Sequence, residues 1–305
     1  RASRAALMSV SWFLLLLKVS MSSSARIALV LLPFAPVIAA SACAWHYGHF
    51  RWQPALLCLL FALLAQVASN LANDYFDFVK GCDTAGRVGP RRAVVSGDIA
   101  PRTMLYVTLA TLGVACCFGL GLLYYGGWWL LPVGMVIALC ALAYTAGPYP
   151  LAYHGLGDVA VFVFFGLVPV NLTYYVQALA FNETAFWLSV AMGLLSINLL
   201  LVNNYRDREE DEAANKRTTV VIFGRRFAEY AYLTNGILGV ILLIPVWSGF
   251  APGYWLMPLG YLVLHVVTWA KIRRRRGMEL NPFLGATARN QILYAVLISL
   301  AWCFS

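Results

Sequence analysis

The sequence predicts an all-α membrane protein, and composition and patterning carry that prediction. Of the 305 residues, 61% are hydrophobic and only 11% are charged, with a mean hydropathy of +0.74. Soluble domains carry roughly 25% charged residues, so the shortage of charge decides the class. The apolar residues form long runs, and no run alternates with the two-residue period of a strand, which disfavours a β-barrel.

About nine runs are long enough to cross a bilayer, for which a helix needs ~20 apolar residues. We place them at 27–46, 53–73, 103–125, 128–146, 158–179, 184–203, 227–247, 253–270 and 286–304. Residues 26–305 are therefore expected to form a single transmembrane domain. Residues 1–25 form an N-terminal extension, whose apolar run at 6–17 is too short to span and suits a helix on the membrane surface.

The Lys and Arg residues indicate which helix ends face the cytoplasm. With nine helices and a cytoplasmic N-terminus, every basic residue except Arg51 falls on the cytoplasmic side. That asymmetry satisfies the positive-inside rule. Topology and contact with anionic membrane lipids then explain the net charge of +9, and nucleic acid is not needed to explain it.

Two acidic clusters interrupt the apolar sequence, at residues 70–83 and 203–211, each at the end of a long apolar run. Ionisable residues at such depth are expensive, and their default interpretation is functional. Because residues three and four apart share one face of a helix, each cluster forms a polar stripe. The first stripe contains Asn70, Asn73, Asp74 and Asp77, and the second contains Asn203, Asp207 and Asp211.

These stripes have the chemistry of a site for Mg²⁺ and diphosphate. Mg²⁺ takes one or two carboxylates and completes its shell with water and phosphate oxygens. Neither stripe contains His or Cys, which argues against zinc. Nearby cations would bind the remaining phosphate oxygens. The basic candidates are Lys80, Arg87, Arg91 and Arg92 in the first loop, and Arg206, Lys216 and Arg217 in the second.

A simpler interpretation is that the Asp residues pair with these same Arg residues and only anchor the helix ends. Two clusters with the same arrangement of amides and carboxylates make that interpretation less favourable than it is for one cluster. Three further acids, Glu209, Glu210 and Glu212, are expected to lie on a solvated helix face.

A third segment, residues 144–158, breaks the helical pattern with a Gly-Pro pair and two further glycines. Irregular backbone at membrane depth is tolerated only against protein or a cavity. Its tyrosines Tyr144, Tyr149 and Tyr153 either face a developing carbocation, which aromatic faces stabilise, or belong to an interfacial belt. Asp158 opens the fifth expected helix, where it could orient a substrate hydroxyl.

At these residues the chain resembles the UbiA superfamily of intramembrane aromatic prenyltransferases. The resemblance runs from about residue 26 to the C-terminus, and its motifs are similar to those of the branch that prenylates 1,4-dihydroxy-2-naphthoate in menaquinone synthesis. The motifs are Asn73-Asp74-Tyr75-Phe76-Asp77, Arg87-Val88-Gly89-Pro90, residues 149–158, Phe164-Phe165-Gly166 and Asn203-Asn204-Tyr205-Arg206-Asp207.

The resemblance implies about nine transmembrane helices around a central cavity, capped by the two acidic loops on the cytoplasmic side of a bacterial inner membrane. It also implies transfer of a polyprenyl group from polyprenyl diphosphate to the naphthoate, with loss of diphosphate and CO₂. Mg²⁺ would be held by Asn73, Asp74, Asp77, Asn203, Asp207 and Asp211, with Asp83 replacing a family aspartate whose position is Gly81 here. Asp158 and Tyr149 are further catalytic candidates, and Asn70, Asn204, Tyr144 and Tyr153 join the basic residues as substrate contacts.

Two alternatives are left open by the residues. One is a prenyltransferase for another aromatic acceptor, such as 4-hydroxybenzoate. The other is a transporter coupled to cations, because inward-facing carboxylates also mark ion pathways. A transporter predicts ionisable groups near the bilayer midplane. The nine apolar runs contain no Asp, Glu, Lys or Arg beyond their first four residues, which disfavours a transporter.

Overall fold

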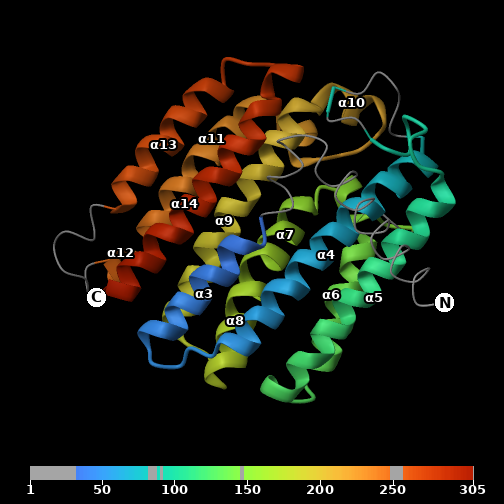
Figure 1. Ribbon diagram of the computed structural model, residues 1–305. Helices are drawn as coiled ribbons and strands as arrows, with labels where there is room; N and C mark the ends of the chain where they lie inside the picture. The colour runs from blue at the N-terminus through green and yellow to red at the C-terminus, as the bar shows by residue number, and fades with distance from the viewer. Residues whose placement is uncertain (1–31, 82–87, 90–91, 145–147, 248–256, 305) are drawn as a thin grey trace, which may run out of the picture.

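The computed structural model of the chain describes residues 32–81, 88–89, 92–144, 148–247 and 257–304. Within those residues all regular structure is helical, and the long helices lie side by side in a bundle (Figure 1). The helices are α3 (Phe34–His46), α4 (Trp52–Val79), α5 (Pro101–Gly126), α6 (Leu130–Ala143), α7 (Gly157–Phe162), α8 (Val168–Ala178), α9 (Glu183–Arg206), α10 (Arg208–Ala213), α11 (Thr219–Ile241), α12 (Ile244–Trp247), α13 (Met257–Ile272) and α14 (Asn281–Phe304). Two 3₁₀ turns, Leu151–Tyr153 and Gly277–Leu280, and a π-helix, Val163–Leu167, complete the order.

Each of the nine expected apolar runs overlaps a helix, but nine membrane spans are not confirmed. Six helical segments of the described chain are long and apolar enough to cross a membrane, the fifth expected run being the continuous segment Gly157–Ala178. The helices α3, α6 and α13 have 13, 14 and 16 residues. At 1.5 Å per residue they are about 20–24 Å long, less than the ~30 Å thickness of the hydrocarbon core. The expected extension at residues 1–25 lies outside the described residues.

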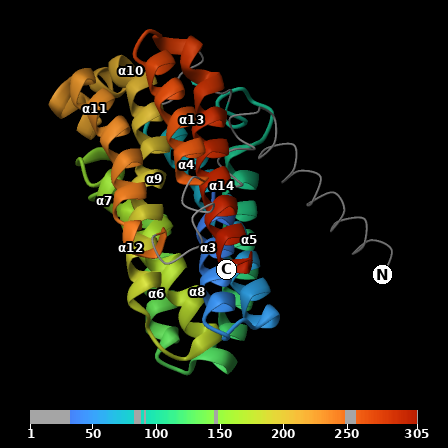
Figure 2. The same ribbon diagram turned by 90° about the vertical axis from the view of Figure 1, so that its left-hand side faces the viewer.

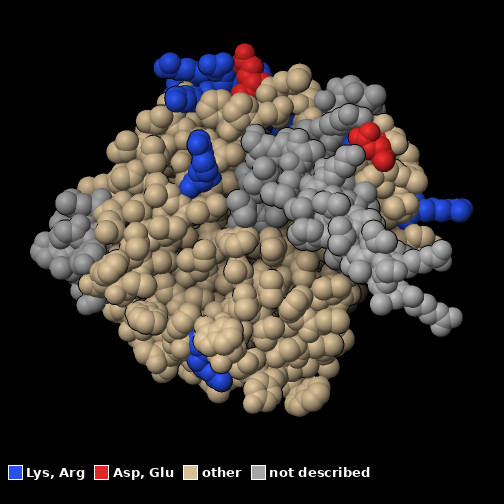
Figure 3. Space-filling view, viewed as in Figure 1, with Lys and Arg blue, Asp and Glu red and all other residues tan. Residues whose placement is uncertain are grey.

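The surface divides into a charged end and an apolar belt. Figure 3 shows Lys and Arg side chains gathered at the end of the molecule where α13 leads into α14, above a broad surface with few charged side chains. The four arginines 273–276 follow α13 directly and are exposed. An apolar belt with basic residues at its edge is what a membrane-embedded helical protein presents.

The core of the bundle is organised around α9. In the most apolar 18-residue stretch of α9, 67% of the residues are buried inside the protein, whereas in that of α5 the share is 22%. It packs against α3, α7, α8, α11 and α14, and both views show it among the other helices (Figures 1 and 2). Leu188, Met192, Leu195 and Leu199 contribute its buried side. Because α9 is held on several sides, the polar residues at its C-terminal end have well-defined positions.

The π-helix crosses α9 where Gly166 meets Gly193, so no side chain separates the two backbones. A Cβ added to Gly166 would lie 2.4 Å from Cα of Gly193 and 2.7 Å from the backbone oxygen of Ser189. The π-helix widens the turn at this point. Together these features place Phe164 and Phe165 on the cavity wall described below.

Gly166→Ala is therefore expected to lower the stability of the fold. The added methyl group meets backbone rather than a flexible side chain, so the cost is about 1–3 kcal/mol or more. The measurement is the melting temperature in detergent. Gly134→Ala is the matched control, because a Cβ on Gly134 meets nothing within 4 Å. Equal melting temperatures for the two variants would contradict the close contact between the π-helix and α9 at Gly166.

Candidate active site

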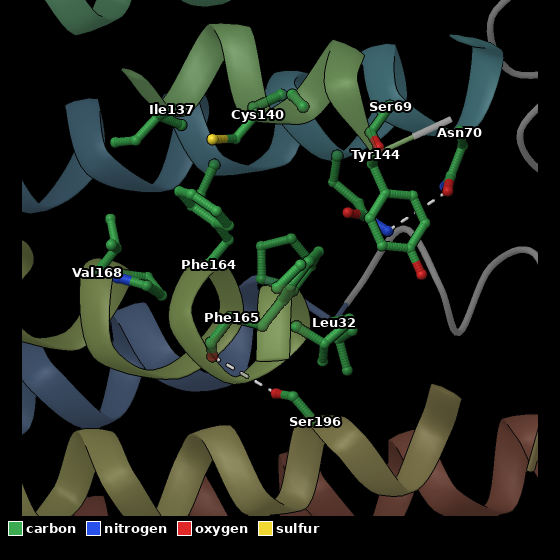
Figure 4. A pocket seen from close by; sticks show the side chains of 18 of the residues that line it. Leu32, Ser69, Asn70, Ile137, Cys140, Tyr144, Phe164, Phe165, Val168 and Ser196 are labelled. Carbon is green, nitrogen blue, oxygen red and sulfur yellow. Dashed lines mark hydrogen bonds between the residues drawn. The ribbon is translucent and has the colours of Figure 1, made fainter. Parts of the chain in front are cut away.

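A cavity of about 540 Å³ lies among α4, α5, α6, α9 and the continuous segment from α7 to α8. Its wall has a polar part and an apolar part. Figure 4 shows Tyr144, Ser69 and Asn70 on one side, and Ile137 and Val168 on the other. The charged and amide groups on the wall are Gln66, Asn70, Asn73, Asp74, Asp77, Arg92, Asp158, Asn203, Asn204, Asp207, Glu210, Asp211 and Lys216. The structure thus places both acidic stripes on one cavity.

The first stripe belongs to the last turns of α4, which continues beyond the apolar run as far as Val79. Asp74 and Asp77 are only 3% and 6% exposed. The backbone N–H of Ala93 donates to Oδ2 of Asp74 at 3.1 Å, and Arg92 donates from Nη2 to Oδ2 of Asp77 at 3.2 Å. The hydroxyl of Tyr153 donates to Oδ1 of Asp77 at 2.8 Å. Residues from two later segments therefore hold these carboxylates in place.

The second stripe begins where α9 ends and continues into α10. Asp207 and Asp211 are 6% and 7% exposed. Arg206 donates from Nε and Nη2 to the two carboxylate oxygens of Asp207, both at 2.6 Å. Its Nη2 also donates to Oδ1 of Asn203 at 2.8 Å, and its Nη1 to Oδ1 of Asn281 at 3.0 Å. Arg206 thus orients the stripe from behind. Its side chain is fully buried and is not part of the cavity wall.

The loop after α10 adds a cation to the cavity. Nζ of Lys216 lies 3.3 Å from Oδ1 of Asp211. Burial acts to lower the pKa of Lys216, but the carboxylates of Asp211, Asp77 and Asp207 outweigh it, so the pKa lies above the ordinary value for lysine. The ammonium group is consequently charged throughout the neutral pH range.

Tyr153 lies between the two basic loops. Nζ of Lys80 is 4.6 Å from the centre of its ring, and Nζ of Lys216 is 5.5 Å from the same point. The hydroxyl of this tyrosine contacts Asp77. Tyr153 therefore links an acid of the first stripe with a lysine from each loop.

Asp158 occupies another part of the same wall. The hydroxyl of Thr219 donates to its Oδ2 at 2.5 Å. Its Oδ1 is buried, and no group in the described chain hydrogen-bonds to it. The ring of Tyr144 also lies on this wall, and Figure 4 shows it beside Ser69 and Asn70. These positions are compatible with contact to a bound substrate.

Several expected site residues lie elsewhere. Tyr149 is 58% exposed and stacks on His154, with ring centres 3.7 Å apart, so its side chain is outside the cavity wall. Arg217 is exposed, and its backbone N–H donates to the carbonyl oxygen of Tyr153 at 3.1 Å. Lys80 is exposed at the end of α4. The expected contacts Asp83, Arg87 and Arg91 lie outside the described residues.

Glu210 corrects an expectation. It is partly buried, lines the cavity and accepts a hydrogen bond from the backbone N–H of Val88 at 2.8 Å. The sequence did contain a signal for this placement. Glu210 lies three residues after Asp207, and residues i and i+3 share a helix face. Glu209 does lie on the exposed face, where Arg225 contacts both of its carboxylate oxygens at 2.5 and 2.6 Å. Thr219 and Ser69 also line the cavity, and no sequence pattern singled them out.

The donors on the wall fit a hard cation that keeps other ligands. Oδ1 of Asp74 is buried, and within the described chain it has no hydrogen-bond partner. No three His, Cys, Asp or Glu side chains in that part of the chain are grouped closely enough to hold a metal ion by themselves. Mg²⁺ commonly uses one or two carboxylates and takes water and substrate phosphate for the rest, so a partial, oxygen-only set suits it.

The fold and this cavity define a multi-pass helical membrane protein with an enclosed acidic site. The model of the UbiA prenyltransferase family matches residues 33–301, and the chain belongs to that family. The resemblance predicted from the motifs is thereby confirmed.

Curated relatives match along most of the chain. The 1,4-dihydroxy-2-naphthoate octaprenyltransferase of Escherichia coli is 35% identical over 279 residues, covering 88% of this chain and 90% of that protein. The protein of the same name from Bacillus subtilis is 28% identical over 274 residues, covering 89% and 88%. The human UbiA prenyltransferase domain-containing protein 1 is 29% identical over 214 residues, covering 65% and 59%.

Solved structures share the fold. A UbiA homologue from Archaeoglobus fulgidus, bound to GPP and Mg²⁺, superposes with a TM-score of 0.60 at 16% identity, covering 91% of this chain and all (100%) of that one. The apo structure of a UbiA homologue from Aeropyrum pernix gives a TM-score of 0.63 at 17% identity, covering 90% and 98%. At these identities the likeness concerns the fold.

Proposed function

We propose that this protein transfers a polyprenyl group from polyprenyl diphosphate to 1,4-dihydroxy-2-naphthoate in an Mg²⁺-dependent reaction. Diphosphate and CO₂ leave, and the product is demethylmenaquinol, a step of menaquinone synthesis. The observation that carries the proposal is one cavity with buried carboxylates, amides and cations in one part and apolar side chains in the other. Relatives named for this reaction, which match along most of the chain, support the choice of substrates.

The carboxylates are proposed to hold the metal. Asp74 and Asp77 from α4, with Asp207 and Asp211 from the end of α9 and from α10, would bind Mg²⁺ together with the amide oxygens of Asn73 and Asn203. When bound, the metal supplies positive charge to the leaving diphosphate. The unpartnered Oδ1 of Asp74 supports this assignment, because a buried carboxylate oxygen without a partner is costly.

The cations on the wall are proposed to bind the remaining phosphate oxygens. Arg92 and Lys216 line the cavity and are paired with Asp77 and Asp211. These side chains are therefore already oriented before substrate arrives. Donors that need no reorganisation stabilise charge as it develops on the leaving group. Lys80, above the ring of Tyr153, would extend the same set of contacts.

The apolar part of the cavity is proposed to protect the reactive carbon. When the bond between carbon and diphosphate breaks, an allylic cation is left, and water would convert it to an alcohol. Phe164, Phe165 and Ile137 surround the space and exclude water. A ring carbon of the naphthoate then forms the new carbon–carbon bond. The carboxylate leaves as CO₂ and returns its bonding electron pair to the ring, so no net proton is released. Asp158 and Tyr144 would orient the acceptor.

The proposed location is the bacterial cytoplasmic membrane, with the acidic end of the cavity facing the cytoplasm. Most of the basic residues seen in Figure 3 lie toward one end of the apolar belt, and positively charged loops favour the cytoplasmic side. The transporter alternative is not favoured, because the ionisable groups of both acidic stripes lie at the ends of α4 and α9. Accessibility labelling of single cysteines placed in the loop after α10 tests this orientation.

A membrane assay tests the proposed reaction. Membranes containing the protein receive Mg²⁺, 1,4-dihydroxy-2-naphthoate and polyprenyl diphosphates of several lengths, with 4-hydroxybenzoate offered in parallel. We expect prenylated naphthoquinol, release of CO₂, and loss of activity when the metal is chelated. Product from 4-hydroxybenzoate alone would preserve the chemistry and overturn the acceptor. Absence of product from both acceptors would overturn the proposed function.

A further inference from the structure

A glutamine side chain lies deep in the cavity, away from the carboxylates. Gln66 on α4 is 7% exposed and lines the cavity wall. It belongs to an apolar run and lies eight residues before Asp74, about 12 Å along the helix axis. Polar side chains at membrane depth are costly, and their default interpretation is functional. None of the roles proposed for the acidic stripes needs this amide.

Two further polar side chains of α4 lie on the same wall. Ser69 and Asn70 line the cavity about one turn closer to Asp74 than Gln66 does. Nε2 of Gln66 donates to Oδ1 of Asn70 at 3.5 Å. The amide of Asn70 is thereby oriented with its oxygen toward Gln66 and its N–H donors directed away from it. Gln66, Ser69 and Asn70 are called the α4 donors below, because they offer N–H and O–H groups without a charge.

The charged part of the wall is unfavourable for an acceptor that carries a carboxylate. Its acidic residues outnumber its basic residues, Arg92 and Lys216. These two cations lie 3.2 and 3.3 Å from carboxylate oxygens of Asp77 and Asp211, at the end of the cavity proposed for the diphosphate. A carboxylate that leaves water still needs hydrogen-bond donors. The α4 donors supply them one to two helical turns away from Asp74.

The space beside the α4 donors fits a flat aromatic ring. Figure 4 shows the ring of Tyr144 beside Asn70, and the rings of Phe164 and Phe165 between this polar part and the apolar part of the cavity. Aromatic rings pack favourably against one another in stacked or edge-to-face arrangements. Asp158 lies on the same wall with a buried Oδ1 that has no hydrogen-bond partner in the described chain. A ring hydroxyl and a ring carboxylate would therefore find different partners here.

We propose that the α4 donors bind the carboxylate of the aromatic acceptor, and that Gln66 selects for acceptors that carry this group. This inference rests on the proposed function and names a residue that controls acceptor choice. Neutral donors also suit a carboxylate that is to be lost. When CO₂ leaves, the bonding electron pair moves from the carboxylate into the ring. An ion pair would stabilise the carboxylate more than this transition state, and such an interaction slows the step.

Two ligands that differ only in the carboxylate, 1-hydroxy-2-naphthoate and 1-naphthol, test the proposal. Binding is measured by titration calorimetry in detergent, without prenyl donor, while Mg²⁺ and inorganic diphosphate occupy the acidic end. Gln66→Leu should weaken the affinity for 1-hydroxy-2-naphthoate by about tenfold or more, as expected for a lost hydrogen bond to a charged group. The affinity for 1-naphthol should not change. Gln53→Leu is the matched control and should change neither, because Gln53 is exposed on the same helix outside the cavity wall.

Ser69→Ala provides a second variant with a smaller change in the side chain. It should lower the affinity for 1-hydroxy-2-naphthoate severalfold and again leave that for 1-naphthol unchanged. Melting temperatures in detergent show whether each variant is folded. No loss for the naphthoate, equal losses for both ligands, or a wild-type protein without preference for the naphthoate would each overturn the proposal. Failure of the prenyl-transfer assay with the selective losses still present would refute the proposed reaction alone.

Discussion

Asp77→Asn is expected to lower prenyl transfer by about 100-fold or more, equivalent to about 2.7 kcal/mol of transition-state stabilisation. Asp77 is 6% exposed on the cavity wall, where Tyr153 and Arg92 each donate to one of its oxygens. The amide keeps the volume of the carboxylate, but it removes the negative charge that the proposed Mg²⁺ site requires. The same loss is expected for Asp207→Asn, from the other acidic stripe.

The control for these variants is Asp98→Asn. Asp98 is exposed outside the cavity wall and accepts a hydrogen bond from the hydroxyl of Ser96 at 2.8 Å. Asp98→Asn should therefore have little effect on turnover. Turnover is measured at saturating Mg²⁺, and melting temperatures in detergent show whether each variant is folded. A folded Asp77→Asn protein with nearly wild-type turnover would remove this residue from the metal site.

Arg206→Lys is expected to raise the Mg²⁺ concentration needed for half-maximal activity by about 10–100-fold, the range found when residues that orient metal ligands are changed. Lysine keeps the positive charge but lacks the planar fork that contacts Asp207 through two nitrogens. The contacts with Asn203 and Asn281 would be lost at the same time. Arg206 is proposed to act as a positioning residue, because it holds Asp207 and Asn203 without lining the cavity.

A second readout does not depend on turnover. The rise in melting temperature on adding Mg²⁺ and prenyl diphosphate should be smaller in Arg206→Lys than in the wild-type protein. Arg217→Lys is the matched control, because Arg217 is a basic residue that lies exposed nearby. A raised KM for prenyl diphosphate with unchanged Mg²⁺ dependence would instead mean that Arg206 contacts the diphosphate directly. Arg206→Ala is less informative, since breaking a buried ion pair costs about 3–5 kcal/mol of stability.

Helical periodicity made much of this site predictable. Asp74 and Asp77 follow a long apolar run at helical spacing, so their shared face could be read directly from the chain. The same spacing joins Asn203 to Asp207 and Asp211, although α9 ends at Arg206 and α10 carries Asp211. The first stripe already required the helix to continue past the apolar run as far as Asp77, and α4 ends two residues later at Val79.

The placement of the charged and aromatic groups could not be predicted in the same way. Arg206 lies within the second acidic cluster, next to Asp207, which suggested a phosphate ligand. Its three side-chain nitrogens instead contact residues of the protein. Tyr149 and Tyr153 are four residues apart in one irregular segment, yet the first is exposed and the second donates to Asp77. Irregular backbone has no fixed period, so spacing does not determine where such side chains point.

By itself the sequence determined the helical membrane class, the family and the two acidic stripes, because hydrophobicity, charge and helical period are local properties of the chain. The tertiary structure alone decided that both stripes line one cavity, that Arg206 lies behind them and that Glu210 joins the wall. These features depend on contacts between residues far apart in the chain, and such contacts follow from how whole helices pack against one another.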